Sequence, residues 1–226
     1  MLEDPNKNDK LPTDQMISAW EKQFESKIAT IASADDPAHD LLHFKRVVQM
    51  AKHLCIEEGA NPWVVIPAAW LHDFVIVPKD SSLRNQASRL SAERASLYLR
   101  EIGYPETYLE QIAHAIEGHS FSANIDVNTI EAQIVQDADR LDGLGAIGIA
   151  RCFATAGLLK RNFYSEEDPF CERRMPNDAE FTIDHFYKKL FRTIETLKTN
   201  TGRKEGLRRA EVMKKYLADL SLEVAK

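Results

Sequence analysis

Helix start and stop signals recur along nearly the whole chain, and they constrain its fold more than any other feature. Apolar residues at a spacing of three and four run from Leu41 to Cys55 and stop near Gly59. Asn61 then offers a helix cap, and Pro62 suits the first helical position because its missing N–H has no helical partner there. We therefore expect two helices that meet at the sequence GANP.

The same signals predict six more helices, at 13–32, at 83–102, from Pro105, from Thr129, at about 182–198 and at 203–224. Alternating strand patterns with two-residue hairpin signals are nearly absent. The chain is therefore predicted to be all-α, a helical bundle with additional C-terminal helices. The irregular stretch 161–180 is predicted to be a loop, and its length suits either a lid over a site or a plain connection.

Composition excludes several classes of partner. A chain of 226 residues, 44% of them hydrophobic, can bury a sizeable core, and we expect one domain over 1–226. The net charge of -6 argues against nucleic acid and anionic membranes as partners, because both reward a basic surface. Charges interrupt every apolar run well before the ~18 residues that a membrane span needs. An anionic ligand would therefore have to be bound by a local group of cations.

The N-terminus and the cysteines indicate the compartment. Residues 1–11 are polar, lack the apolar core of a secretory signal, and are expected to be disordered. Cys55, Cys152 and Cys171 are odd in number, far apart in sequence and in no CxxC arrangement, as expected for reduced thiols. A cytoplasmic location is therefore expected, and the chain is predicted to be a monomer or a homodimer.

One motif is set aside. The sequence GLGAIG at 143–148 matches GxGxxG, but a dinucleotide fingerprint requires a preceding strand, whereas IEAQIVQDADRL is predicted to be helical. Its small residues are instead expected to let a helix approach its neighbour closely.

Four ionisable residues are predicted to point inward. His72 and Asp73 stand in the otherwise apolar run AAWLHDFVIV, and on a helix from 62 to 74 both face the interior or its edge. His43 lies on the core side of the preceding helix, and Asp139 shares a stripe with apolar residues of a later one. Burying even one such group without a partner costs about a few kcal/mol. These residues therefore need hydrogen-bonding or charged partners in the interior.

Taken singly, each residue is best interpreted structurally, since a lone inward His is more often a hydrogen-bonded core residue than a ligand. Together, two imidazoles and two carboxylates form a mixed nitrogen and oxygen shell that suits a divalent metal such as Mn, Fe, Mg or Zn. Four protein ligands on an ion that accepts six leave positions for water and substrate. Such an arrangement suits hydrolysis.

The separated pattern H…HD…D resembles the HD-domain metal-dependent phosphohydrolase superfamily. HDLLHFKRV, AAWLHDF and IVQDADRLDGLGAIGIAR are similar to its consecutive elements, while SRLSAERA, HAIEGHSFS and EDPF are similar to its YedJ/YpgQ-like bacterial branch. The resemblance spans roughly residues 35–200. It implies an all-helical HD-domain bundle, with a metal-binding core at 35–160, a loop at 161–180 and C-terminal helices at 181–226. Carried over position by position, the implied metal ligands are His43, His72, Asp73 and Asp139, while His39 is assigned a cap or surface role.

The resemblance also implies hydrolysis of phosphoester or phosphoanhydride bonds, with a nucleoside triphosphate pyrophosphohydrolase or related nucleotidase as the expected activity. The implied cofactor is one divalent metal, among Mn, Mg, Co, Fe, Ni and Zn, with Mn favoured. Asp73 is placed to orient the attacking water, and His114 and His119 are candidates for proton transfer. In two-metal relatives, histidines at such positions bind a second ion, so a two-metal phosphodiesterase is the alternative.

Phosphate binding is expected after the HD pair. Lys79 and Arg84 correspond to basic residues of the YedJ-like pattern and could hold a polyphosphate tail, although ordinary solvated charges are nearly as good an interpretation of each alone. The expected partner is a small phosphorylated molecule, in particular a nucleotide. A catalytically silent nucleotide-binding sensor remains the alternative to an enzyme.

Overall fold

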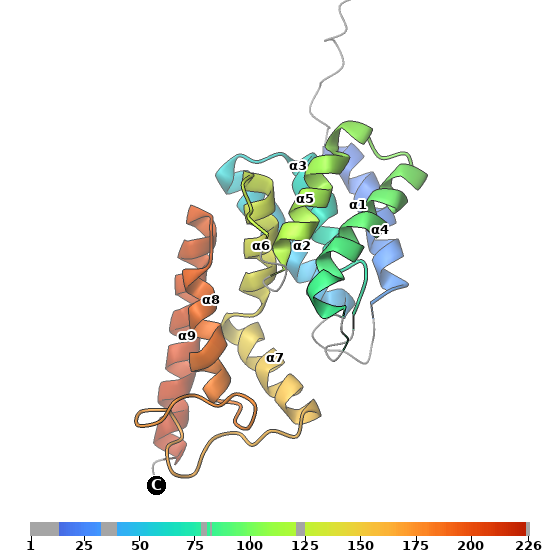
Figure 1. The fold of residues 1–226 in the computed structure, drawn as a ribbon. Coiled ribbons are helices and arrows are strands. Elements are labelled where there is room, and N and C mark those ends of the chain that lie inside the picture. Colours follow the sequence, from blue (N-terminus) through green and yellow to red (C-terminus); the bar gives the residue numbers. More distant parts are fainter. Residues whose placement is uncertain (1–13, 33–39, 78–80, 82, 121–124, 225–226) are drawn as a thin grey trace, which may run out of the picture.

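The computed structural model describes residues 14–224, apart from 33–39, 78–80, 82 and 121–124. Within this part of the chain no strand forms, and the prediction of an all-α fold is confirmed. The helices are α1 (Asp14–Ala29), α2 (Leu41–Glu58), α3 (Pro62–Leu71), α4 (Ala87–Glu101), α5 (Leu109–His119), α6 (Ile130–Asp142), α7 (Gly145–Leu158), α8 (Phe191–Glu195) and α9 (Asn200–Val224) (Figure 1).

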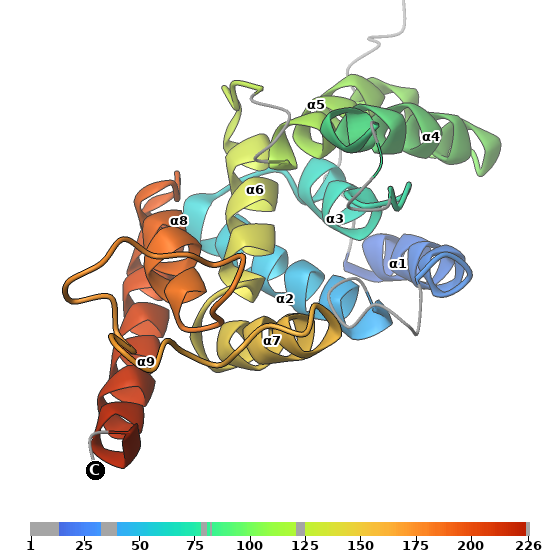
Figure 2. The same cartoon turned by 60° about the horizontal axis from the view of Figure 1, so that its bottom comes forward.

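Helix α3 forms the centre of the bundle. Every residue from Trp63 to Leu71 is buried, and α3 packs against α1, α2, α5 and α6. Because no face of α3 meets water, its sequence can be apolar on every side. Helices α7, α8 and α9 form a second group to one side of α2 and α6 (Figure 2). The C-terminal end of α3 therefore lies deep in the fold, where a buried site can be built.

Local capping chemistry sets several helix ends as the sequence predicted. Gly59 takes a left-handed conformation with φ 67 and ends α2, and the side chain of Asn61 accepts from the amide of Trp63 at the start of α3. Thr129 caps α6 by accepting from the amide of Ala132. The predicted junction at GANP is confirmed.

Other boundaries differ from the sequence prediction. The helix expected at 62–74 ends at Leu71, because the amide of Phe74 bonds to the Leu71 carbonyl in a tighter turn. The helix expected at 83–102 begins with a 3₁₀ turn, Arg84–Gln86. The helix expected at 182–198 is a π turn followed by the short α8, and α9 starts three residues before its expected position.

The sequence GLGAIG joins α6 to α7, so the dinucleotide fingerprint is excluded by the helix that precedes it. Gly145 has a φ of 70 at the start of α7. A β carbon on Gly148 would overlap the carbonyl of Gly143. The glycines therefore allow a tight bend of 63° between α6 and α7 and a close approach of their backbones.

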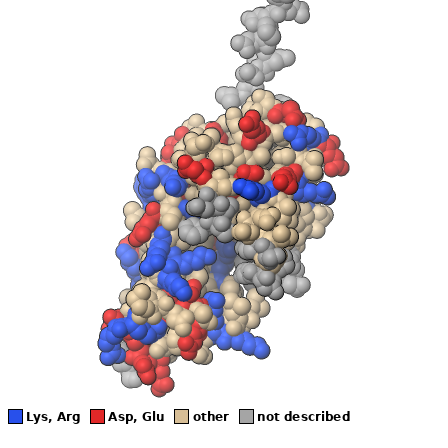
Figure 3. Space-filling view, in the orientation of Figure 1, with Lys and Arg blue, Asp and Glu red and all other residues tan. Residues whose placement is uncertain are grey.

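Surface charge and helix composition also bear on possible partners. Lys and Arg side chains gather over α8 and α9, although the whole chain is acidic (Figure 3). Among the described helices none is by itself long and apolar enough to cross a membrane, although the bent pair α6 and α7 passes the same test together.

Candidate metal centre

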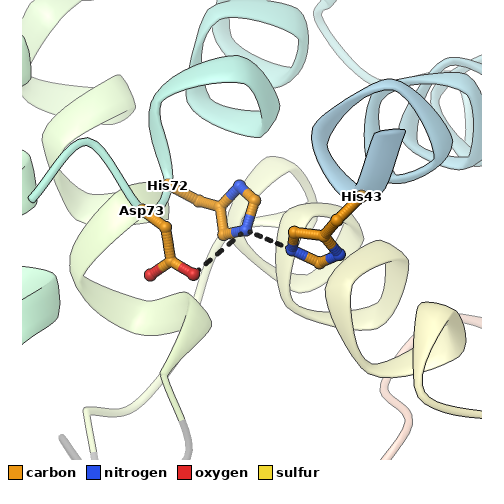
Figure 4. Close-up of side chains that lie close together, drawn as sticks. All are labelled: His43, His72 and Asp73. Carbon is orange, nitrogen blue, oxygen red and sulfur yellow. Dashed lines mark hydrogen bonds and ion pairs between the residues drawn. The ribbon is translucent and has the colours of Figure 1, made fainter. Parts of the chain in front are cut away.

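The candidate site lies where α2, α3 and α6 meet. His43 is in the first turn of α2, where the Asp40 side chain accepts from its backbone amide at 2.8 Å. His72 and Asp73 lie in the turn that follows α3 rather than on the helix, and Asp139 is in the last turn of α6. Figure 4 shows the side chains of His43, His72 and Asp73 directed toward one another. Three segments far apart in sequence thus deliver the four predicted ligands to one place.

The donor atoms are spaced as ligands of a common ion would be. The Nε2 atoms of His43 and His72 are 3.3 Å apart, and Asp73 Oδ2 is 3.6 Å from His72 Nε2. Asp139 Oδ1 is 3.6 Å from His43 Nε2 and 3.9 Å from His72 Nε2. Ligands about 2.0–2.2 Å from a metal lie about 2.8–3.6 Å apart at octahedral to tetrahedral angles. The donors of His43, His72 and Asp73 therefore form a group that could hold one divalent ion, and Asp139 lies at the edge of this group.

The proton positions on the two rings support the same conclusion. His43 Nδ1 is 2.8 Å from a carboxylate oxygen of Asp142, and His72 Nδ1 is 2.9 Å from the carbonyl of Ala69. These oxygens only accept, so each Nδ1 donates, and the Nε2 atom of each ring faces the other donors of the site. Burial lowers the pKa of His72 to about 4, against the opposing charge of Asp73, so this ring is neutral near pH 7. Two imidazole nitrogens and two carboxylates that face one another form a donor set that suits a cation.

His119 joins this cluster from the end of α5. Its Nδ1 donates to the carbonyl of Ile116 at 2.6 Å, and its Nε2 lies 3.4 Å from Asp73 Oδ1. Burial works against the charged ring, but the hydrogen bond and the charge of Asp73 outweigh it and raise the pKa of His119. Asp73 thus lies between His72 and a histidine whose pKa its charge raises.

The other predicted residues are less well placed. His114 also lies on α5, but no contact of the described residues links it to the cluster, and its Nε2 is buried without a hydrogen bond there. Lys79 and His39 lie outside the described residues. For Arg84 only the backbone is described, in the 3₁₀ turn before α4. The structure therefore brings together five of the candidate site residues.

The sequence analysis missed three charged residues beside the site. Asp142 is the residue bonded to His43, and Arg46 and Arg151 both pair with it. Burial alone would raise the pKa of Asp142, but its hydrogen bonds to His43 and Arg46 lower it well below the ordinary range. One signal was available, because Asp142 follows Asp139 and Arg46 follows His43 at the same helical offset of three.

Comparisons with known proteins show the family that the chain resembles. A family model described as HD domain matches residues 41–144. The chain is 28% identical over 207 residues to the uncharacterised protein YpgQ of Bacillus subtilis, covering 90% of this chain and 93% of that protein. The solved structure of Bacillus subtilis YpgQ in complex with ADP is similar, with a TM-score of 0.70, 29% identity and coverage of 89% of this chain and 96% of that one. A crystal structure of an HD-superfamily hydrolase from Bacillus thuringiensis has a TM-score of 0.71 and 30% identity, over 91% of this chain and 97% of that one.

Proposed function

Because this chain belongs to the HD superfamily and shares the fold of an HD-superfamily hydrolase, we propose that it is a metal-dependent phosphohydrolase. The observation that carries the proposal is the set of inward donors, with two imidazole lone pairs and two carboxylates around one point. His43, His72, Asp73 and Asp139 are the proposed ligands. A bound divalent ion supplies Lewis acidity toward a phosphoryl oxygen and lowers the pKa of water.

The chain's own residues supply orientation and a proton. Asp73 directs one oxygen toward His72 and the other toward His119, so it can hold an attacking water in a fixed direction. His119 Nε2, paired with Asp73, can donate a proton to the leaving oxygen. Asp73 and Asp139 are 21% and 29% exposed, whereas both ligand histidines are buried. Substrate would therefore approach from the carboxylate side.

A nucleoside triphosphate is the proposed substrate, cleaved to a monophosphate and pyrophosphate. The ADP complex of the similar YpgQ protein supports a nucleotide, and the mixed nitrogen and oxygen donors support a divalent ion, for which we propose Mn²⁺ among Mn, Mg, Co, Fe, Ni and Zn. Lys79 and Arg84, in the segment after Asp73, are the proposed contacts of the phosphate tail. A small phosphorylated molecule is thus the proposed partner, and the protein is proposed to act in the cytoplasm as a monomer or homodimer.

The test is a substrate screen with separate measurement of phosphate and pyrophosphate. Wild-type protein with Mn²⁺ is expected to release pyrophosphate from nucleoside triphosphates, and Asp139→Ala is expected to lose turnover while its circular dichroism spectrum keeps its helical form. Arg192→Ala, on α8, is the matched control and is expected to retain activity. Tight nucleotide binding without release of phosphate, pyrophosphate or monophosphate would establish the sensor alternative.

A further inference from the structure

Asp142 is the last residue of α6, and it is almost completely buried behind the candidate metal centre. Its Oδ2 accepts from His43 Nδ1 at 2.8 Å and from Arg151 at 2.5 Å. Arg46 donates to Oδ1 at 2.6 Å and to Oδ2 at 3.1 Å. Three donors from two helices, α2 and α7, therefore converge on one carboxylate, which has no freedom to turn away from His43.

The contact determines which nitrogen of His43 carries the proton. A carboxylate held beside Nδ1 keeps the proton on that atom, so the lone pair of Nε2 is directed at the other donors of the site. Arg46 lies on α2 one turn after His43, so it ties the carboxylate to the same helix that carries the ring. The orientation of His43 is thus fixed from behind, by groups that do not face the metal centre.

The second arginine comes from a different part of the fold. Arg151 lies on α7, beyond the segment 41–144 that matches the HD family model, and α7 packs against α9. Arg209 of α9 adds a hydrogen bond of 2.5 Å to the carbonyl of Leu141, the residue before Asp142. Side chains of the C-terminal helices therefore hold the end of α6 in place.

We propose that Asp142 is a positioning residue for His43, and that Arg151 extends this support to the C-terminal helices. The proposal rests on the proposed function, since positioning matters only if His43 is a metal ligand. It predicts that a residue outside the matched HD segment controls metal affinity without touching the ion. A carboxylate that served only to neutralise two arginines would leave metal binding unchanged when it is replaced.

The experiment measures Mn²⁺ affinity by titration calorimetry on metal-free protein. Asp142→Asn keeps the size of the side chain but removes its charge, and it is expected to weaken affinity by about 10–100-fold, as is usual for such supporting partners. Arg151→Met is expected to weaken affinity several-fold, and Arg151→Lys to restore part of the loss. Arg174→Met is the matched control, because it also removes a guanidinium from a buried carboxylate, that of Asp184, and it should leave Mn²⁺ affinity unchanged.

A second readout does not depend on metal. Long-range ¹H–¹⁵N spectra of the metal-free protein report which nitrogen of His43 carries hydrogen. The wild type is expected to show the Nδ1–H form, and Asp142→Asn to show an increased share of the Nε2–H form.

The outcomes separate this inference from the proposed function. A wild type that binds no Mn²⁺ overturns the metal centre itself. A wild type that binds Mn²⁺, together with a folded Asp142→Asn of equal affinity, overturns the positioning role alone, as does an Nε2–H form of His43 in the metal-free wild type. If Asp142→Asn does not fold, the loss in Arg151→Met and its recovery in Arg151→Lys decide.

Discussion

His119 is the residue whose role separates the two metal stoichiometries. If it transfers a proton, His119→Asn should retain one Mn²⁺ per chain and lose turnover by about 10²–10⁴-fold. The pairing of its Nε2 with Asp73 gives the reason, because the variant keeps a polar side chain but loses the ring that holds the proton. Elemental analysis and single-turnover kinetics measure the two quantities.

His114→Asn is the matched comparison on the same helix, because no described contact links His114 to the cluster. It should reduce turnover less than His119→Asn. Two ions per chain in the wild type, with one lost on replacement of His119, would contradict the one-metal proposal and favour the phosphodiesterase alternative.

At this scale the sequence indicated the residues that we propose as ligands, but not the residues that support them. His72 and Asp73 stand out because ionisable residues are rare in apolar runs, and His43 stands out because it lies on the core side of its helix. Arg151 does not stand out, since an arginine on a helix of mixed character usually faces solvent. Only the packing of α7 beside the end of α6 turns it toward Asp142. Such a contact depends on tertiary geometry that periodicity does not contain.

Among the elements, the start of α9 depends on one glycine. A β carbon on Gly202 would overlap the carboxylate of Asp137 and the hydroxyl of Thr199, and that carboxylate accepts from the amides of Lys198 and Thr199. Gly202→Ala is expected to lower the free energy of unfolding by about 1–3 kcal/mol, measured by urea denaturation.

Gly157 provides the control, because a β carbon there meets nothing within 4 Å on α7. Gly157→Ala is expected to raise the free energy of unfolding by up to about 1 kcal/mol, since alanine loses less backbone entropy in a helix. Equal effects at the two positions would show that helix propensity, and not the Asp137 contact, dominates.

The segment between α7 and α8 is held by a buried ion pair that should make its stability depend on acid. Asp184 is fully buried and accepts from Arg174 and from the amide of Asn177. Burial alone would raise its pKa, but Arg174 and Asn177 lower it below the ordinary 3.8. A lowered folded pKa means that this stabilisation is complete above pH 3.8 and is lost as the pH falls through the folded pKa.

Asp184→Asn should therefore flatten the decline of unfolding free energy below pH 3.8 relative to the wild type. Denaturant unfolding at a series of acidic pH values measures the slope. Glu166→Gln, which changes an exposed carboxyl of the same segment, should leave the slope as it is. If the unfolding free energy of Asp184→Asn fell with pH as steeply as that of the wild type, this ion pair would not contribute to the acid response.

The elements also show where sequence-based prediction works. Gly59, Asn61 and Thr129 end or begin helices through bonds to residues a few positions away, so local sequence was sufficient. The early start of α9 was not predictable, because its preceding amides bond to Asp137, which lies some sixty positions earlier. Long-range partners of this kind leave no periodic signal.

On the scale of the whole molecule, the apolar helix α3 explains why the candidate site is buried. Helices pack around it on several sides, and the histidine and aspartate that follow it are carried into the space between α2 and α6. The sequence predicted an all-α bundle because every helix pattern agreed on it. It did not predict that α7, α8 and α9 form a separate group beside α2 and α6 (Figure 2), since nothing local specifies how amphipathic helices associate.

The hydrogen bond between His43 and Asp142 joins residues 99 positions apart, and this imposes an order on biosynthesis. Chains emerge from the ribosome with the N-terminus first. His43, His72 and Asp73 are thus exposed to the cell long before Asp139 and Asp142 are translated. During that interval His43, His72 and Asp73 lack both Asp139, the last proposed ligand, and Asp142, the carboxylate that orients His43. Acquisition of the proposed ion therefore has to wait until Asp139 and Asp142 have been translated, and shorter nascent chains would bind the ion poorly.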